Sequence, residues 1–351
     1  MGDSDSCFRE GTVLGLGNPL LDISANTGND FLEKYGLKHN DAILAEERHL
    51  PIYSEMVEKY NAEYIAGGSC QNTMRVAQWV AKKPNVFAFM GCIGKDEFGK
   101  ILETKAKEAG VLVNYQLHDT APTGTCAVVI TDNGANRSLC ANLSAANHFS
   151  REHLDTPTSQ SIINNAKYFY ITAYFLTVSP PSIMYIAKHA HENKKTLLMN
   201  LSAPFLCTLF KEPLMEVFPY IDVLFGNETE ITTLAAELGF KSDDMEKIIL
   251  HIANLPKKNE ERKRRVIVTQ GNDDVLYAAD TMIIKYPVDI VKPEEIVDTN
   301  GAGDAFVGGF LAQYIQKKSA HSCVLCGIYA ATQVIKQSGC IVPEKMEFID
   351  V

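Results

Sequence analysis

The most specific chemical pattern in the chain is a glycine-rich loop followed by an acid, D-T-N-G-A-G-D-A-F-V-G-G-F at residues 298–310. Gly301 and Gly303 permit a tight turn whose backbone N–H groups point at one place, and a helix starting there adds the positive end of its dipole. Asp304 falls in the first turn of that helix. A carboxylate beside an anion site is unfavourable unless it accepts a proton from an attacking hydroxyl, which indicates phosphoryl transfer. A capped glycine loop is also common in α/β proteins, so this loop alone does not decide the function.

Two common nucleotide-binding motifs are started but not completed. Residues 94–101 follow a P-loop until Ile101, which replaces the hydroxyl that would bind Mg²⁺. Residues 15–20 begin like a dinucleotide fingerprint, but Leu20 stands in place of the third glycine and Pro19 disfavours a helix there. The expected phosphate site is therefore the loop before Asp304.

The elements that must position this loop are those of an α/β protein. From about residue 160, apolar runs alternate with helical segments, which is typical of βαβ units and of a sheet covered on both faces. In this part we expect strands at 167–172, 196–200, 221–225, 265–269, 274–279 and 282–287, and helices at 181–193, 228–238, 243–255, 302–316 and 320–336. Gly308 and Gly309 would let the helix after the loop press closely on the sheet.

The first 150 residues are organised differently. We expect strands at 12–17 and 85–91, helices at 69–81 and 96–109, an extended stretch at 111–117, and a hairpin of 124–131 and 137–141 around Asp132-Asn133-Gly134. Short β segments between α/β units predict a small sheet that stands apart from the main one.

Composition narrows the class of protein. The chain has 351 residues, of which 46% are hydrophobic, and a formal net charge of −10. This is enough apolar sequence for a core without disulfides or metal, and it excludes collagen, coiled coil and disorder. The acidic balance disfavours nucleic-acid binding. The nine cysteines are scattered singly, apart from a C-x-x-C at 323–326 in an apolar helix, so we expect free buried thiols and a reducing compartment.

No signal peptide opens the sequence, and the uncharged run 168–187 is broken by Pro180-Pro181, so we expect a strand and a helix there, not a membrane span. Gly2 fits a loose myristoylation pattern, although Asp3 and Asp5 oppose membrane binding. The basic stretch 257–265 favours a solvated loop, with a nuclear address as the alternative. We expect a cytoplasmic protein, with nuclear access left open.

The motifs together carry a family resemblance. Residues 298–311 resemble the C-terminal signature of the ribokinase-type (PfkB) carbohydrate and nucleoside kinases, residues 66–72 (A-G-G-S-C-Q-N) resemble its N-terminal glycine pair, and Asn227–Glu230 resembles its N-x-x-E magnesium motif. The resemblance implies a ribokinase-like α/β fold, a doubly wound, mostly parallel sheet covered by helices, with a small β-sheet lid. It places the kinase domain at 12–343, the lid in parts of 18–72 and 111–150, and a tail at 1–11.

Within this family the sequence is most similar to the adenosine kinases. The stretches that carry the similarity are 17–24, 66–72, 122–127, 136–143, 175–180, 200–205 and 224–230. The resemblance implies transfer of the γ-phosphate of ATP to the 5′-hydroxyl of adenosine, giving AMP and ADP. Two alternatives stay open: another sugar or nucleoside kinase of the family, and a non-catalytic nucleoside-binding regulator.

The same resemblance assigns roles to individual residues. Asp304 would be the general base, and the N–H groups of Gly301, Ala302 and Gly303 would stabilise the charge on the transferring phosphoryl group. Arg137, on the hairpin, would either close over the phosphates or remain an exposed charge. The acceptor site would hold ribose with Asp22, whose acceptor oxygens disfavour deoxy sugars. The resemblance assigns Asn18, Gly68, Ser69, Asn72, Cys126 and Asn300 to the same site.

The purine would lie between apolar walls made by Leu139, Ala141, Leu143, Tyr174 and Phe205. Two positions depart from the expected pattern: Ala42 stands where Gln is expected, and Tyr174 replaces Phe, which puts fine base selectivity in doubt. Mg²⁺ would be held by Glu230 and Asn227, with a monovalent cation as a further candidate cofactor. For ATP the expected contacts are Asn227, Thr269 and Gly271 with the glycine loop. We expect no nucleic-acid partner, no membrane partner and a monomer.

Overall fold

The computed structural model describes residues 8–132 and 136–349, and the chain forms two compact units. Unit 1 comprises Met1–Glu10, Asn18–Phe149 and Val291–Val351, and unit 2 comprises Gly11–Gly17 and Ser150–Ile290. Gly2, Cys7 and the predicted turn residues Asn133 and Gly134 lie outside the described residues.

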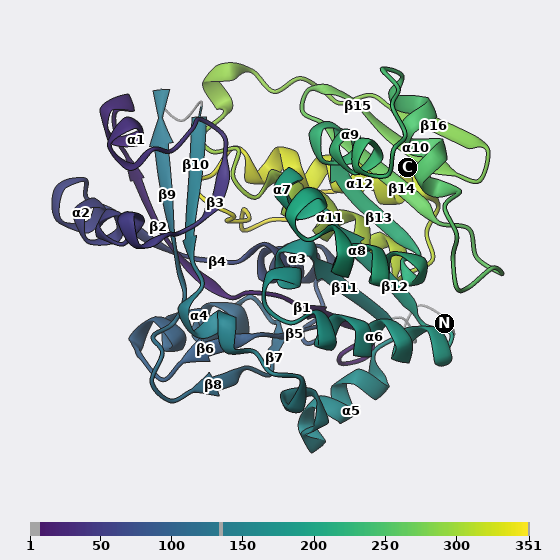
Figure 1. Ribbon diagram of the computed structural model, residues 1–351, viewed down its shortest axis with the longest axis horizontal. Helices are drawn as coiled ribbons and strands as arrows, with labels where there is room; N and C mark the ends of the chain where they lie inside the picture. The colour runs from purple at the N-terminus through teal and green to yellow at the C-terminus, as the bar shows by residue number, and fades with distance from the viewer. Residues whose placement is uncertain (1–7, 133–135, 350–351) are drawn as a thin grey trace. The chain divides into compact units, whose positions relative to one another are not determined.

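Unit 2 is built on a mostly parallel sheet (Figure 1). Its strand order is β16-β15-β14-β13-β12-β11-β1, with the pairs from β1 to β14 parallel and β15 and β16 antiparallel. The strands are β1 Val13–Leu16, β11 Tyr168–Thr172, β12 Thr196–Asn200, β13 Val223–Asn227, β14 Arg265–Gln270, β15 Asp273–Ala279 and β16 Met282–Tyr286. The helices are α5 Pro157–Asn165, α6 Pro180–Glu192, α7 Pro204–Leu209, α8 Lys211–Val217, α9 Glu228–Glu237 and α10 Met245–Ala253. Every strand and helix predicted after about residue 160 is present, and each begins within two residues of its predicted start.

Unit 1 contains the small sheet, in the order β3-β10-β9-β2-β4. Its strands are β2 Leu20–Asn26, β3 Ala42–Leu44, β4 Glu63–Gly67, β9 Thr125–Thr131 and β10 Asn136–Asn142. One face packs on α1 Asn29–Tyr35 and α2 Pro51–Lys59 through a buried cluster that includes Ile23, Ala127 and Val129 (Figure 1). The predicted hairpin of β9 and β10 is confirmed, whereas β2, β3, α1 and α2 were not predicted, because their periodicity is spread over short segments.

The remaining elements of unit 1 are helical or short strands. They are α3 Ser69–Ala81, β5 Phe87–Met90, β6 Cys92–Gly94, α4 Glu97–Glu108, β7 Leu112–Val113, β8 Gln116–His118, α11 Ala302–Tyr314 and α12 Ala320–Val334. Gly308 and Gly309 on α11 serve helix contacts, which corrects the prediction that they face a sheet. A Cβ on Gly308 would lie 2.8 Å from Val76 of α3, and one on Gly309 would lie 2.3 Å from the carbonyl oxygen of Cys326 on α12. The backbones therefore approach closely only because these positions lack side chains.

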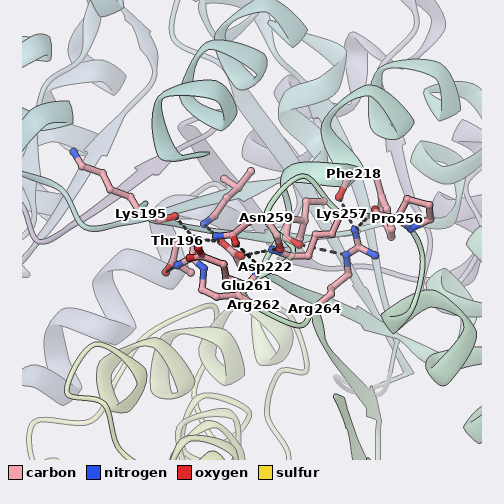
Figure 2. Close-up of polar contacts among 12 residues, drawn as sticks. Lys195, Thr196, Phe218, Asp222, Pro256, Lys257, Asn259, Glu261, Arg262 and Arg264 are labelled. Atoms are coloured by element: carbon pink, nitrogen blue, oxygen red, sulfur yellow. Dashed lines mark hydrogen bonds and ion pairs between the residues drawn. The ribbon is translucent and has the colours of Figure 1, made fainter. Parts of the chain in front are cut away.

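The basic stretch before β14 is only in part the solvated loop that its composition predicts: Lys258 and Lys263 are exposed, whereas Arg264 is buried and Arg262 is half-buried. Arg264 is 1% exposed and donates to the carbonyl oxygens of five residues: Phe218, Ile221, Ile252, Leu255 and Pro256. Lys257 and Arg262 pair with Asp222, which is also buried and accepts a bond from the backbone N–H of Leu197 (Figure 2). Charge counts cannot distinguish these cations from solvated ones, because their partners come from distant segments.

The cysteines and the uncharged run follow the predictions. The eight cysteines among the described residues are free and buried. Residues 168–187 form β11 and most of α6. No helix in the described part of the chain has both the length and the apolar character needed to cross a bilayer.

Candidate active site

Asp304 lies in the first turn of α11 and is held by two side chains of α3. Ser69 Oγ donates to one carboxylate oxygen at 2.6 Å, and Asn72 Nδ2 donates to the other at 3.1 Å. Ser69 and Asn72 are three residues apart and so lie on one face of the helix. Burial raises the pKa of Asp304 to about 6, although both hydrogen bonds lower it. A carboxylate with this pKa is ionised at neutral pH and is a stronger base than an exposed aspartate.

The glycine loop before Asp304 is shaped differently at its two glycines. Gly301 caps α11 with a φ of 78°, and a Cβ there would lie 2.8 Å from Cβ of Cys340. Gly303 has ordinary backbone angles, and a Cβ there would meet no atom within 4 Å. Gly301 is thus required by conformation and packing. Gly303 leaves open space beside the helix N-terminus, where an anion can approach backbone N–H groups.

Asp298 anchors the start of this loop. Its carboxylate, fully buried, accepts bonds from the backbone N–H groups of Asn300, at 2.6 Å, and Gly339. It also pairs with Arg137 of β10, whose guanidinium donates to the carbonyl oxygen of Val297. The exposed-charge alternative for Arg137 is therefore wrong, because the side chain is 5% exposed and bound to an acid. Contact between Arg137 and a phosphate stays a prediction.

Asp22 of β2 is the second buried acid of unit 1, at 8% exposure. Its carboxylate covers Gly67, where a Cβ would lie 2.4 Å from its oxygens. Gly68 follows with a φ of 93°, and a Cβ there would lie 2.4 Å from the carbonyl oxygen of Asn18. The glycine pair is thus explained by close approach and by left-handed φ. The pKa of Asp22 is raised to about 7, first by burial and second by the charge of Asp304, while Arg75 lowers it.

Strand register brings several predicted substrate residues onto one face of the small sheet. Asp22 pairs with Cys126, Cys126 pairs with Ala141, and Leu139 pairs with Ala42. Paired residues point to the same side, and alternation puts this side opposite the face that packs on α1 and α2. Leu143 is buried just beyond β10. Apolar side chains and one acid therefore share this face, and Ala42 adds no polar group beside Leu139.

The predicted magnesium motif lies in unit 2 and forms a capping box at the start of α9. Asn227 Oδ1 accepts from the backbone N–H of Glu230 at 2.8 Å, and Glu230 Oε2 accepts from that of Asn227 at 3.0 Å. Glu230 is 5% exposed, and burial raises its pKa to about 7. No cation among the described residues is paired with this buried carboxylate. Such a group suits Mg²⁺, which binds one or two protein carboxylates and keeps its waters. Among the residues the structure describes, no three His, Cys, Asp or Glu side chains form a metal cluster.

The other predicted residues of unit 2 lie at the ends of parallel strands. Tyr174 follows β11 and lies near Phe205 of α7, with ring centroids 6.4 Å apart. The hydroxyl of Tyr174 donates to the carbonyl oxygen of Ser202 at 3.0 Å, so the group that distinguishes it from Phe binds the backbone. Thr269 ends β14, and Gly271, with a φ of 61°, turns the chain toward β15. This turn explains Gly271, and its contact with ATP stays a prediction.

Two residues of the unit 1 site were not singled out from the sequence. Asp298 is part of the C-terminal signature, but the sequence alone gives it no separate role. Arg75 belongs to no motif. Arg75 Nη1 donates to the carbonyl oxygen of Ala66 at 2.8 Å and to Asn72 Oδ1 at 3.4 Å. Its spacing of three residues from Asn72 on a predicted helix was the available signal.

Comparison with known proteins identifies the family. A family model described as "pfkB family carbohydrate kinase" matches residues 29–346. The chain belongs to the pfkB carbohydrate kinase family. This pfkB kinase is 49% identical over 345 residues to adenosine kinase 2 of Arabidopsis thaliana, with 98% of this chain and 99% of the relative covered. The predicted resemblance to adenosine kinases, the kinase class and the ribokinase-like fold are confirmed.

Solved structures of adenosine kinases have the same fold as this chain. The pfkB kinase superposes on Anopheles gambiae adenosine kinase in complex with P1,P4-di(adenosine-5) tetraphosphate with a TM-score of 0.93, at 50% identity, covering 96% of this chain and 100% of the other. Schistosoma mansoni adenosine kinase in complex with adenosine and AMP gives a TM-score of 0.89 at 34% identity, covering 96% and 98%.

Proposed function

We propose that this pfkB kinase transfers the γ-phosphoryl group of ATP to the 5′-hydroxyl of adenosine, giving AMP and ADP. The observation that carries the proposal is Asp304, an acid with a pKa raised to about 6 and held by Ser69 and Asn72 beside the open cradle at Gly303. Asp304 takes the proton of the attacking hydroxyl. The N–H groups at the start of α11 stabilise charge on the transferring oxygens.

The acceptor preference is supported by the small sheet. Asp22, which is buried on the small sheet, offers two acceptor oxygens for the vicinal ribose hydroxyls. Loss of either hydroxyl would leave a buried acceptor unpaired, which disfavours deoxynucleosides. Leu139 and Ala141 provide the apolar surface for the purine, and relatives at 49% and 50% identity are named adenosine kinases.

Mg²⁺ is the cofactor we propose besides ATP. Glu230 would hold the ion, largely through water, and Asn227 would support it. When bound, the ion neutralises charge on the ATP phosphates. Dependence on a monovalent cation stays a prediction, which replacing K⁺ by tetramethylammonium would check.

The activity is tested with Mg-ATP and a panel of acceptors: adenosine, 2′-deoxyadenosine, 3′-deoxyadenosine, inosine and ribose. We expect AMP from adenosine with the highest kcat/KM, and roughly 100-fold or lower values for the deoxynucleosides. Asp22→Asn should reduce that discrimination. Ribose or inosine as the preferred acceptor would refute the substrate assignment, and binding of adenosine without turnover would favour the regulator alternative.

The cytoplasmic location and the monomeric state belong to the same proposal. The free thiols and the net charge of −10 support a soluble protein in a reducing compartment. Cell fractionation checks the location, including nuclear access, and light scattering at several concentrations checks the assembly.

A further inference from the structure

Arg75 is linked to Asp304 through the amide of Asn72. A side-chain amide has one accepting end and one donating end. The accepting end of Asn72 faces Arg75 Nη1 at 3.4 Å, and the donating end reaches Asp304 Oδ2 at 3.1 Å. A cation at Oδ1 therefore opposes the flipped amide, in which the NH₂ group would face the guanidinium and the carbonyl would face a carboxylate.

Arg75 also lies among the titratable groups of several elements. Its positive charge lowers the pKa of Asp22 on β2, of Tyr115 before β8 and of Cys340 after α12. The other charged groups that act on these three are Asp304 on α11, Glu103 on α4 and, for Cys340, Asp22; each raises the pKa of its neighbour. Arg75 is thus the positive charge that opposes the effect of Asp304 on Asp22.

The contacts of Arg75 differ from those of an arginine that only stabilises the fold. Arg264 uses its guanidinium in five bonds to carbonyl oxygens. Arg75 makes one bond to the backbone, at Ala66 just before the glycine pair, and its Nε is buried with no hydrogen-bond partner among the described atoms. Unlike the guanidinium of Arg264, that of Arg75 is therefore not saturated by backbone carbonyls.

We propose that Arg75 is a positioning residue for phosphoryl transfer: it orients the Asn72 amide toward Asp304 and places a positive charge near Asp22. The inference rests on the proposed function for its catalytic consequence, but the orientation and the charge effect belong to the folded protein alone.

The kinetic test compares Arg75→Met, which removes the charge and the donors, with Arg75→Lys, which keeps the charge. For Arg75→Met we expect kcat to fall roughly 10- to 100-fold, and the acid limb of the pH profile to move up by about one unit, because losing the cation raises the carboxyl pKa values. Arg75→Lys should keep the acid limb in place and recover part of kcat. Lys82→Met is the matched control, since it removes a positive charge from the end of the same helix, where Nζ binds the carbonyl oxygen of Met346.

A double-mutant cycle separates positioning from general packing. If Arg75 acts through Asn72, Arg75→Met should cost much less in kcat in an Asn72→Ala background than in the natural protein. Losses that multiply independently, or an acid limb that does not move in Arg75→Met, would overturn the proposal. Arg75→Gln, which retains a donor for Ala66, replaces Arg75→Met if circular dichroism shows that the latter does not fold.

Direct titration tests the charge effect without catalysis. With ¹³C-carboxyl-labelled aspartate and Asp22→Asn and Asp304→Asn for assignment, the pKa of Asp22 should be higher in Arg75→Met than in the natural protein and unchanged in Lys82→Met. An unchanged Asp22 pKa would refute the proposal. If the natural protein lacked kinase activity, only the proposed function would fail, because this titration would still give its own result.

Discussion

The region around Asp304 and Asp22 in unit 1 holds its aspartates differently from the region around Asp222 in unit 2, although Asp298 of unit 1 is also paired with a cation, Arg137. In unit 2, Asp222 is surrounded by Lys257, Arg262 and a backbone N–H, so its charge is matched by cations (Figure 2). In unit 1, Asp304 is held by neutral donors, and Asp22 faces a like charge. Their pKa values are raised to about 6 and about 7.

The difference teaches how one residue type serves two purposes. A buried carboxylate that is neutralised by cations supports the fold once it is formed, since removing one partner leaves the other charge unpaired. A carboxylate that is desolvated without a full counter-charge is a better proton acceptor and costs stability when ionised. The first kind of carboxylate suits a structural ion pair, and the second suits a catalytic base.

The largest expected effect is on Asp304→Asn. We expect kcat to fall roughly 1,000-fold, because the general base is lost, while the protein becomes more stable by about 1–2 kcal/mol at pH 7. Because the pKa of Asp304 is raised in the folded state, the stability associated with this group is full below pH 3.8, the ordinary pKa of aspartate, and is lost as pH rises through about 6. The stability gain of Asp304→Asn should therefore shrink toward pH 4. Urea unfolding at pH 4 and pH 7 with kinetics at pH 7 checks both parts, and turnover equal to that of the natural protein would remove Asp304 from its role.

Asp222→Asn should show the opposite pattern. Leaving Lys257 buried without its acid should destabilise the protein by about 3 kcal/mol, while kcat of the folded fraction changes less than about 3-fold. Denaturant unfolding combined with active-site titration measures both quantities. Lys263→Met is the control, because the exposed Lys263–Asp280 pair should contribute less than about 0.5 kcal/mol. A large kcat loss in folded Asp222→Asn would break the division between the two regions.

The glycine loop also contains one residue expected to matter for catalysis, Gly303, and one expected to matter for stability, Gly301. Gly303→Ala should lower kcat or raise KM for ATP roughly 10- to 100-fold without loss of stability, because its Cβ would fill open space where the phosphate is expected. Gly301→Ala should cost about 1–2 kcal/mol of stability, because its φ is 78° and Cys340 is in the way. Thermal melts and ATP kinetics of the pair check this, and a Gly303→Ala protein with normal ATP kinetics would contradict the proposed anion site.

The smallest expected effect concerns Glu230. Glu230→Gln keeps an oxygen for the N–H of Asn227, so stability should hold while the apparent Mg²⁺ affinity falls roughly tenfold. In the natural protein the Mg²⁺ requirement should rise as pH falls below about 7, since protonation of Glu230 competes with the ion. Initial rates against free Mg²⁺ at pH 6 and pH 8 measure this. Glu228→Gln is the control, because Glu228 lies two residues before Glu230 and is exposed. An equal effect from this control would mean that Glu230 acts only through its negative charge.

Much of the fold could be predicted from the sequence where the local pattern is strong. Helix 69–81 and the hairpin of β9 and β10 were predicted from periodicity and turn residues, because these signals are contained in a few neighbouring residues. Short elements such as β3 and α1 were missed, since three to seven residues carry too little periodicity. The charge pattern predicts a solvated Arg264, because its five carbonyl acceptors lie 8 to 46 residues away in the chain and leave no local signal.

The sequence by itself determined the family, the glycine loop with Asp304 and the glycine pair at Gly67-Gly68, because these are contiguous patterns whose chemistry depends on residue type and spacing. Only the tertiary structure decided that Arg137 is paired with Asp298, that the amide of Asn72 joins Arg75 to Asp304 and that Asp222 is matched by cations. Those properties depend on burial and on the charge of neighbours distant in the chain. Solvation and nearby charge set the pKa of a carboxyl group. The same amino acid therefore becomes a catalytic base or part of a structural ion pair only after folding.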